Sequence, residues 1–343
     1  MTPTIRDVAA KAGVSFQLAA AVLGEKKYAR ASEAARKRIA DAAHELGYVP
    51  NVSARILRGD ASKIIGVLID SRAPESMYGV LAEIEHAADA LGYRILIAQA
   101  HDNPEKLMHS YHALKQNGVD GIISFSHDYS EQDSDFRLDR QLKLDPRIVF
   151  VRDTLEPDVS AVDVDFRSGM KQAMDHLTAN GYRKTALLLR TPVPDKLPLS
   201  CHRRLDAFRS CCRKGDVLYL KSADEDVSGL EKECRQLIRE KLLPGKFDSI
   251  IAHDDNLAVI LMRTLAAGGI RIPQDFGLIG FDNLRIDECL PVTLSSLYFD
   301  RKELSGSVLK ILLDKIAGKT EPVRIVCKMK FIPRESTSKK SSI

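Results

Sequence analysis

The chain has 343 residues, of which 44% are hydrophobic and 29% charged, an ordinary composition for a globular protein. At ~100–200 residues per domain, this length predicts two or three domains. No apolar run approaches the ~18–20 residues that cross a bilayer, and no secretory signal opens the chain. We therefore expect a cytoplasmic protein without a membrane partner.

The cysteines do not form a metal-binding or disulfide pattern. They are irregularly spaced, with no C-x-x-C pair and no paired histidines nearby. Their positions are Cys201, Cys211, Cys212, Cys234, Cys289 and Cys327. We expect reduced thiols, no metal site and no cofactor.

The excess positive charge is confined to the first part of the chain. Residues 1–62 carry ten Lys or Arg and six Asp or Glu, whereas the remainder carries 41 residues of each sign. A small basic segment on a neutral body suggests contact with a polyanion, because Lys and Arg that neutralise phosphates release condensed counterions.

The first sixty residues predict short helices with clear start and stop signals. Thr4 caps a helix that continues to Ala12, and Ser15 caps a second one from Phe16 to Leu23. The tight turn between them, with Gly13 at its centre, gives helix-turn-helix spacing. Ser32 and Asn51 then cap a longer third helix ending near residue 46 and a short fourth helix over residues 52–57.

From residue 63 onward, apolar strands alternate with amphipathic helices. Strands are expected at 64–69, 93–98, 121–125, 147–151, 185–189, 217–220, 249–252 and 277–281. Helices are expected at 77–91, 104–117, 167–180, 202–213, 228–241 and 255–267. This rhythm is typical of parallel sheets covered on both faces, so the sequence predicts an α/β body of two doubly wound lobes. Residues 335–343 are too polar to fold alone, and we expect a disordered tail.

Two segments of the head have specific sequences. They are the opening run from Thr4 to Ser15, TIRDVAAKAGVS, and ELGYVPN (residues 45–51) with ARILRG (residues 54–59). The first resembles the signature of the lactose-repressor/galactose-repressor family of bacterial transcription regulators, and the second is similar to that family's third helix end and hinge. Further similarities continue through the body, and together they cover residues 4–333. The resemblance implies a helix-turn-helix head and two lobes of periplasmic-binding-protein type.

The resemblance implies that the second helix lies in the major groove of double-stranded DNA. Ser15, Phe16 and Gln17 would then face bases and phosphate, and we add Thr4 to the DNA-binding set. Gln17 can bond the edge of adenine and Phe16 can touch a thymine methyl, although Phe16 and Leu18 could instead pack in the core of the head. Residue Ala21 occupies a position where relatives usually carry arginine, so the operator differs or the head binds weakly.

The hinge helix is expected to act in the minor groove. The resemblance makes Leu57 the side chain inserted between base pairs, Ala54 a small residue near the groove floor, and Asn51 a cap that also contacts phosphate. Such a short helix is marginal by itself, so we expect it to fold when two copies pair on DNA. A homodimer on a near-palindromic operator follows, without a C-terminal helical tetramer bundle.

A cleft between the two lobes is expected to hold the effector. Arg204 and Asp282 fall on positions that the family uses for this purpose, and a guanidinium with a carboxylate suits a sugar or related polyhydroxyl compound. Asp255 also matches a family position, with a structural role as the alternative, and Asp254 replaces the usual asparagine. Weaker candidates lie at strand ends: Asp70, Ser124 and Phe166.

The expected boundaries divide the chain into five parts. They are the head (1–50), the hinge helix (51–62), an N-terminal lobe (63–163 with about 296–325), a C-terminal lobe (164–295 with about 326–334) and the tail (335–343).

Repression is the usual mode of the family, but the sequence does not identify the effector. A transport-type sugar-binding protein would share the body but not the head, and a regulator that has lost DNA specificity is a further alternative. An enzyme is disfavoured because the sequence lacks a glycine-rich phosphate loop, a G-x-S-x-G elbow and an H-E-x-x-H pair.

Overall fold

The computed structural model describes residues 3–24, 29–49, 61–70, 73–100, 104–125, 138–152, 154–191, 197–212, 216–221 and 226–339. The chain divides into two compact units, a head of residues 1–62 and a larger unit of residues 63–343.

The described residues of the head form the helices α1 (Ile5–Ala12), α2 (Phe16–Leu23) and α3 (Glu33–Leu46). Their ends follow the predicted signals. Gly13 and Gly47 adopt the left-handed conformation that ends α1 and α3, and Ser32 Oγ accepts the Ala35 N–H at 3.3 Å. A small core holds the three helices together, made of Val8, Ala9, Ala12, Ala19, Ile39, Ala42 and Ala43.

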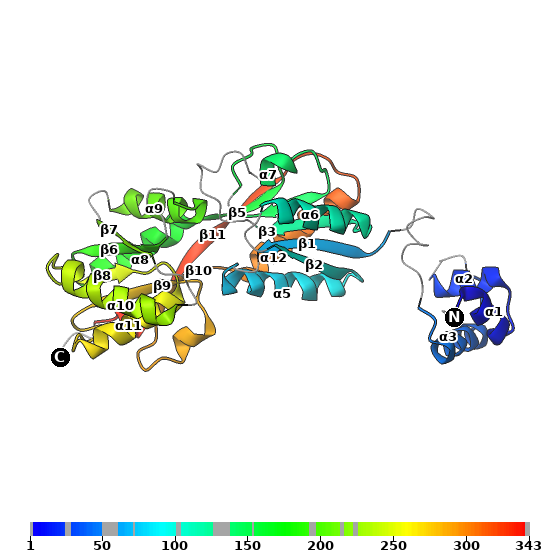
Figure 1. Ribbon diagram of the computed structural model, residues 1–343, viewed down its shortest axis with the longest axis horizontal. Coiled ribbons are helices and arrows are strands. Elements are labelled where there is room, and N and C mark those ends of the chain that lie inside the picture. The colour runs from blue at the N-terminus through cyan, green and yellow to red at the C-terminus, as the bar shows by residue number, and fades with distance from the viewer. Residues whose placement is uncertain are drawn as a thin grey trace. The chain divides into compact units, whose positions relative to one another are not determined.

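The larger unit alternates strands and helices (Figure 1). Its strands are β1 (Ile64–Asp70), β2 (Arg94–Ala100), β3 (Gly121–Phe125), β4 (Ile148–Val151), β5 (Ala161–Asp165), β6 (Thr185–Arg190), β7 (Asp216–Leu220), β8 (Ser249–Ile251), β9 (Gly277–Phe281), β10 (Ser295–Phe299) and β11 (Arg324–Ile332). Its α-helices are α5 (Glu75–Asp89), α6 (Pro104–Gln116), α7 (Leu138–Gln141), α8 (Phe166–Ala179), α9 (Leu199–Cys211), α10 (Val227–Leu237), α11 (Asp255–Ala267) and α12 (Arg301–Ile316). The described residues also form short helices of other types, η1 (Ile238–Leu242), η2 (Arg285–Glu288) and η3 (Glu335–Thr337).

The strands follow the order β2-β1-β3-β4-β5-β11-β10-β9-β8-β6-β7. Strands β1 to β5 form the sheet of the N-terminal lobe, and β6 to β10 form that of the C-terminal lobe. All pairs are parallel except β10 with β11. The arrangement is the predicted pair of doubly wound, mostly parallel lobes.

Both faces of each sheet are covered, which explains why the strands are apolar throughout. In β1, Ile65, Val67 and Ile69 pack in one core with residues of α5 and α12, while Leu68 packs in a second core with residues of α6. In the C-terminal lobe, residues of α8 and α9 belong to the first core, and α10 and α11 build a separate one.

Strand β11 joins the two lobes. Its residues 324–328 pair with β5 in parallel, and residues 329–332 pair with β10 in antiparallel orientation; Figure 1 shows this red strand running from one lobe to the other. We expected the segment from about residue 296 in the N-terminal lobe, but β10 pairs with β9 and therefore lies in the C-terminal lobe. The expectation is wrong for residues 296–299.

The prediction of a disordered tail is wrong for its first residues. Residues 335–337 form η3, and Ser336 and Thr337 are fully buried. The Ser336 hydroxyl donates to the Leu278 carbonyl at 2.6 Å and accepts the Ser295 N–H at 2.8 Å. These polar side chains fold because the C-terminal lobe supplies partners that the segment lacks by itself.

Candidate effector and DNA-binding sites

The start of α2 presents side chains that could meet DNA. Ser15 Oγ accepts the Leu18 N–H at 3.2 Å and so caps the helix, while Phe16 is 44% exposed and Gln17 is exposed. Leu18, by contrast, packs against the core of the head. Of the two interpretations open for these apolar residues, core packing fits Leu18 and surface contact fits Phe16.

Thr4 has a local role at the start of α1. Its backbone N–H and its hydroxyl both donate to the Asp7 carboxylate, at 2.8 and 2.7 Å. These hydrogen bonds lower the pKa of Asp7. The three predicted hinge residues, Asn51, Ala54 and Leu57, lie outside the described residues.

Two buried arginines from opposite lobes meet on one aromatic ring. Arg204 of α9 is 4% exposed, and its Cζ lies 5.6 Å from the centroid of the Phe166 ring and 4.8 Å from that of Phe281. Arg152 follows β4 of the N-terminal lobe, is 5% exposed, and places its Cζ 5.8 Å from the Phe166 centroid and 5.7 Å from that of Phe299. The structure thus brings the predicted residues Arg204 and Phe166 together at the junction of the lobes.

Asp282 stands at the end of β9, directly after Phe281. Its φ of 100° and the φ of 51° at Asn283 are rare for residues with a side chain, and its N–H donates to the Leu297 carbonyl at 2.7 Å. Such backbone costs ~1–3 kcal/mol per residue and concentrates at functional sites. The neighbouring strand therefore holds Asp282 in an uncommon conformation beside the ring that Arg204 contacts.

An ion pair adjoins this cluster. Arg190 Nη2 lies 3.1 Å from Asp254 Oδ2, and the other oxygen of Asp254 accepts the Leu257 N–H at 2.7 Å to cap α11. Burial raises the pKa of Asp254 despite the attraction of Arg190. Burial lowers the pKa of His253 well below its usual range, with Arg204 and Arg190 adding to the effect, so this imidazole is neutral at physiological pH.

Asp255 makes buried contacts within the protein. It is fully buried, its Oδ2 accepts the Leu284 N–H at 2.9 Å, and its Oδ1 accepts the Ser296 hydroxyl at 2.7 Å. Both oxygens are therefore engaged by the protein, which favours the structural role over direct contact with the effector.

A second buried carboxylate accompanies Asp255. Asp287 of η2 is fully buried and lies 3.8 Å from Arg334. Burial raises the pKa of both carboxyls, and the charge of Asp287 raises that of Asp255 further. The pair holds at least one proton at neutral pH, because two like charges in a dry site are unfavourable.

The remaining two candidates lie at strand ends of the N-terminal lobe. Asp70 ends β1 and is 8% exposed, and its carbonyl accepts the Tyr78 hydroxyl at 3.2 Å. Ser124 of β3 is fully buried, and within the described residues its Oγ has no hydrogen-bond partner.

Sequence reasoning missed Arg152, Arg190 and His253. Each follows or ends an apolar parallel strand at its carboxyl end, the edge where ligands of such sheets bind. An arginine directly after Ile148–Val151 was therefore a usable signal.

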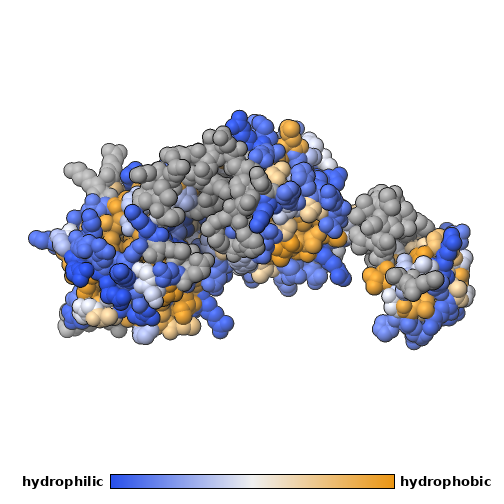
Figure 2. Space-filling model, in the orientation of Figure 1, coloured by the Kyte–Doolittle hydropathy of each residue, from blue (hydrophilic) through white to orange (hydrophobic). Residues whose placement is uncertain are grey.

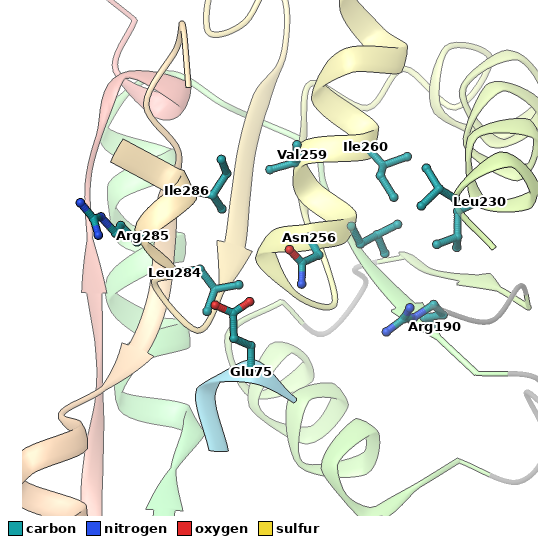
Figure 3. Close-up of a pocket in the computed structure, with 11 residues that line it drawn as sticks. Glu75, Arg190, Leu230, Asn256, Val259, Ile260, Leu284, Arg285 and Ile286 are labelled. Carbon is teal, nitrogen blue, oxygen red and sulfur yellow. The ribbon is translucent and has the colours of Figure 1, made fainter. Parts of the chain in front are cut away.

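An open pocket of about 450 Å³ lies next to the ion pair (Figure 3). In the view of Figure 3, Glu75 of α5 and Leu284 lie on the left of the pocket, and Arg190 and Leu230 lie on its right. The other lining residues are Val227, Asn256, Leu257, Val259, Ile260, Arg285 and Ile286. The lining is largely apolar, so this pocket differs from the polar cluster around Arg204.

In the part of the chain that the structure describes, no helix is long and apolar enough to cross a membrane. The His, Cys, Asp and Glu side chains of the same residues include no group of three placed to hold a metal ion.

Two family models match the chain: bacterial regulatory proteins of the lacI family over residues 4–51, and a periplasmic binding protein-like domain over residues 174–337. The HTH-type transcriptional repressor CytR of Escherichia coli (strain K12) is 27% identical over 321 residues, or 92% of this chain and 90% of CytR.

Two solved structures share the fold. The lac repressor dimer bound to operator and the anti-inducer ONPF has a TM-score of 0.83 at 22% identity, covering 98% of this chain and 99% of that one. The complex of the transcriptional regulator CelR with cellobiose has a TM-score of 0.67 at 24% identity, covering 97% and 99%.

A helix-turn-helix head followed by two periplasmic-binding-protein-like lobes defines a DNA-binding transcription regulator controlled by a small effector. Curated relatives such as CytR are transcriptional repressors rather than enzymes. The head matches the lacI family of bacterial regulatory proteins, and similarity to a repressor of that kind extends over 92% of the chain.

Proposed function

We propose that this protein represses transcription as a cytoplasmic homodimer on a near-palindromic operator, and that a sugar or related polyhydroxyl compound between its lobes controls operator affinity. The observation that carries the proposal is that the buried Arg204 guanidinium lies over the ring of Phe281, the residue directly before Asp282 at the end of β9. A guanidinium donates to hydroxyl oxygens and a carboxylate accepts from hydroxyl groups, so the two together suit a polyol. The bound cellobiose in the CelR complex supports this class of effector.

The homodimer is supported by exposed apolar residues. Ile97 on the edge strand β2 is 49% exposed, and Figure 2 shows hydrophobic residues gathered in the region of this strand. Val227 and Ile286, which line the pocket of Figure 3, are 48% and 43% exposed. A second copy of the chain is the occupant we propose for these surfaces, in keeping with the dimeric lac repressor.

Operator binding is tested by selecting binding sites from random duplexes and measuring affinity by gel shift. We expect enrichment of near-palindromes and release or tightening on addition of the correct effector. Leu57→Ala should weaken binding to the selected site but hardly change binding to random DNA, because insertion of an apolar side chain acts only where the duplex bends. Equal loss on both kinds of DNA would argue against that role.

A second candidate is a regulator whose head has lost sequence specificity. The observation favouring it is the composition of α2, FQLAAAVL, which carries no charged side chain and has Ala21 where relatives usually have arginine. Selection that enriches no sequence, together with equal affinity for all duplexes, would support this candidate.

A further inference from the structure

The guanidinium of Arg204 contains a buried nitrogen, Nε, that has no hydrogen-bond partner among the described residues. A guanidinium can grip a carboxylate or phosphate in bidentate fashion through its side edge, which is formed by Nε and Nη2. Nη1 of Arg204 donates to the Ser200 carbonyl at 3.2 Å, whereas its Nε has no partner within the described residues. Nε is thus a buried donor that a ligand acceptor reaching this edge would satisfy.

Among the described residues, no carboxylate lies within ion-pair distance of Arg204. Asp254 pairs instead with Arg190 at 3.1 Å, and the charge of Arg204 lowers the pKa of Asp254 only as a smaller effect, against the burial that raises it. Because the side chain is only 4% exposed, water compensates its charge poorly. A negatively charged ligand would compensate the positive charge of Arg204, which a neutral ligand cannot do.

A second positive charge reaches the same ring from the other lobe. Arg152 and Arg204 lie 5.8 and 5.6 Å from the Phe166 centroid, measured from each Cζ. An anion near this ring is attracted to both lobes at once, so its binding favours the arrangement in which they approach.

We infer that the effector is a hydroxylated organic anion whose carboxylate or phosphate docks on the side edge of Arg204. Asp282 contacts a hydroxyl of the same molecule. This inference rests on the proposed function, because it specifies the effector that the lobes bind.

The test compares matched ligands on the full-length protein by isothermal titration calorimetry. Each of several neutral sugars is titrated beside its phosphate ester and its sugar acid, which also distinguishes phosphate from carboxylate as the anion. We expect at least one anionic member to bind on the order of tenfold to a hundredfold more tightly than its neutral parent, the range for a charge-assisted hydrogen-bonded pair.

Substitutions test whether Arg204 causes the preference for anionic ligands. Arg204→Met should abolish it, and Arg204→Lys should keep part of it, because lysine retains the charge without the fork. Arg209→Met is the matched control, since Arg209 lies on the same helix and is exposed. Circular dichroism melting reports whether Arg204→Met folds. If Arg204→Met does not fold, a reduced preference for anionic ligands in Arg204→Lys tests the role of Arg204.

Four results would overturn the inference. Three are calorimetric: neutral sugars that bind as well as their anionic partners, an anionic preference that survives in Arg204→Met, or no binding by any anionic ligand in the panel. The fourth is a neutral sugar that changes operator affinity, which would leave the proposed function intact. If the protein binds no operator, the proposed function is wrong. The calorimetric comparison would still test whether the ligand is an anion.

Discussion

Gly280 and Asp255 are fitted to one another: a Cβ on Gly280 would lie 2.0 Å from Oδ1 of Asp255. The missing side chain lets the carboxylate lie against β9, where it receives the Leu284 N–H. The loop that carries Asp282 is thus held by a buried acid on the neighbouring helix.

Gly280→Ala should therefore destabilise the larger unit and disturb the effector site. Displacing a buried carboxyl costs about 1–3 kcal/mol, typical of an overpacked core, and we expect weaker effector binding as well. Urea unfolding and calorimetry measure the two effects. Gly306→Ala is the control, because nothing lies within 4 Å of its Cβ position in α12, and alanine there should stabilise by about 0.5–1 kcal/mol.

The buried pair Asp255 and Asp287 predicts a pH-dependent stability. Burial and the neighbouring carboxylates raise the pKa of Asp255 to about 10 from an ordinary value of 3.8. The folded state then holds a proton that the unfolded chain releases, so this contribution to stability falls as pH rises from about 4 towards 10. The slope is at most about 1.4 kcal/mol per pH unit.

Asp255→Asn should flatten this dependence, since an amide does not titrate. The measurement is the free energy of unfolding in urea at pH 6, 7.5 and 9. Asp275→Asn serves as a control, because the Arg271 side chain holds the pKa of Asp275 at about 2, below the tested range. An unchanged slope in Asp255→Asn would show that another group is responsible.

Phe16 and Leu18 should respond in opposite ways to truncation. Phe16→Ala removes an exposed ring, so we expect little change in melting temperature and a loss of specific DNA affinity. Leu18→Ala removes a side chain that packs against the core of the head and should lower its stability by about 1–2 kcal/mol for a partly buried leucine. Melting curves and gel shifts are measured on both variants. The reverse pattern would indicate that Phe16 packs in the core of the head.

Removal of the chain after Arg334 should destabilise the C-terminal lobe. The deletion removes the Ser336 hydrogen bonds to Leu278 and Ser295 and a Thr337 contact with Ser295 at 2.7 Å. Leaving such buried groups unsatisfied costs about 2–4 kcal/mol in total. Deletion of residues 340–343 alone removes none of these contacts, and equal stability of the two truncated proteins would contradict the prediction.

Most elements followed from local signals, because caps and apolar periodicity act over a few residues. α11 and β9 have the predicted bounds, and Ser15 and Ser32 cap the predicted helices. The strand β11 was not identified although Cys327 and Met329 alternate with Lys328 and Lys330, a period of two that indicates one buried face.

The roles of individual site residues depended on contacts distant in sequence. The resemblance placed Arg204 near the effector but could not show that Arg152, 52 positions earlier, approaches the same ring. Likewise, the partners of Asp255 are Leu284 and Ser296, 29 and 41 positions away. Charge and spacing do not reveal such pairings, because they arise only when strands from different parts of the chain become neighbours.

The path of the chain through β11 bears on how such regulators recombine. The head can be exchanged at a single junction near residue 62, since it is one continuous stretch. Neither lobe is continuous: the chain passes between them after β5, after β10 and within β11 itself. A new DNA specificity can therefore be acquired by one genetic crossover, whereas the two halves of the ligand site are inherited together.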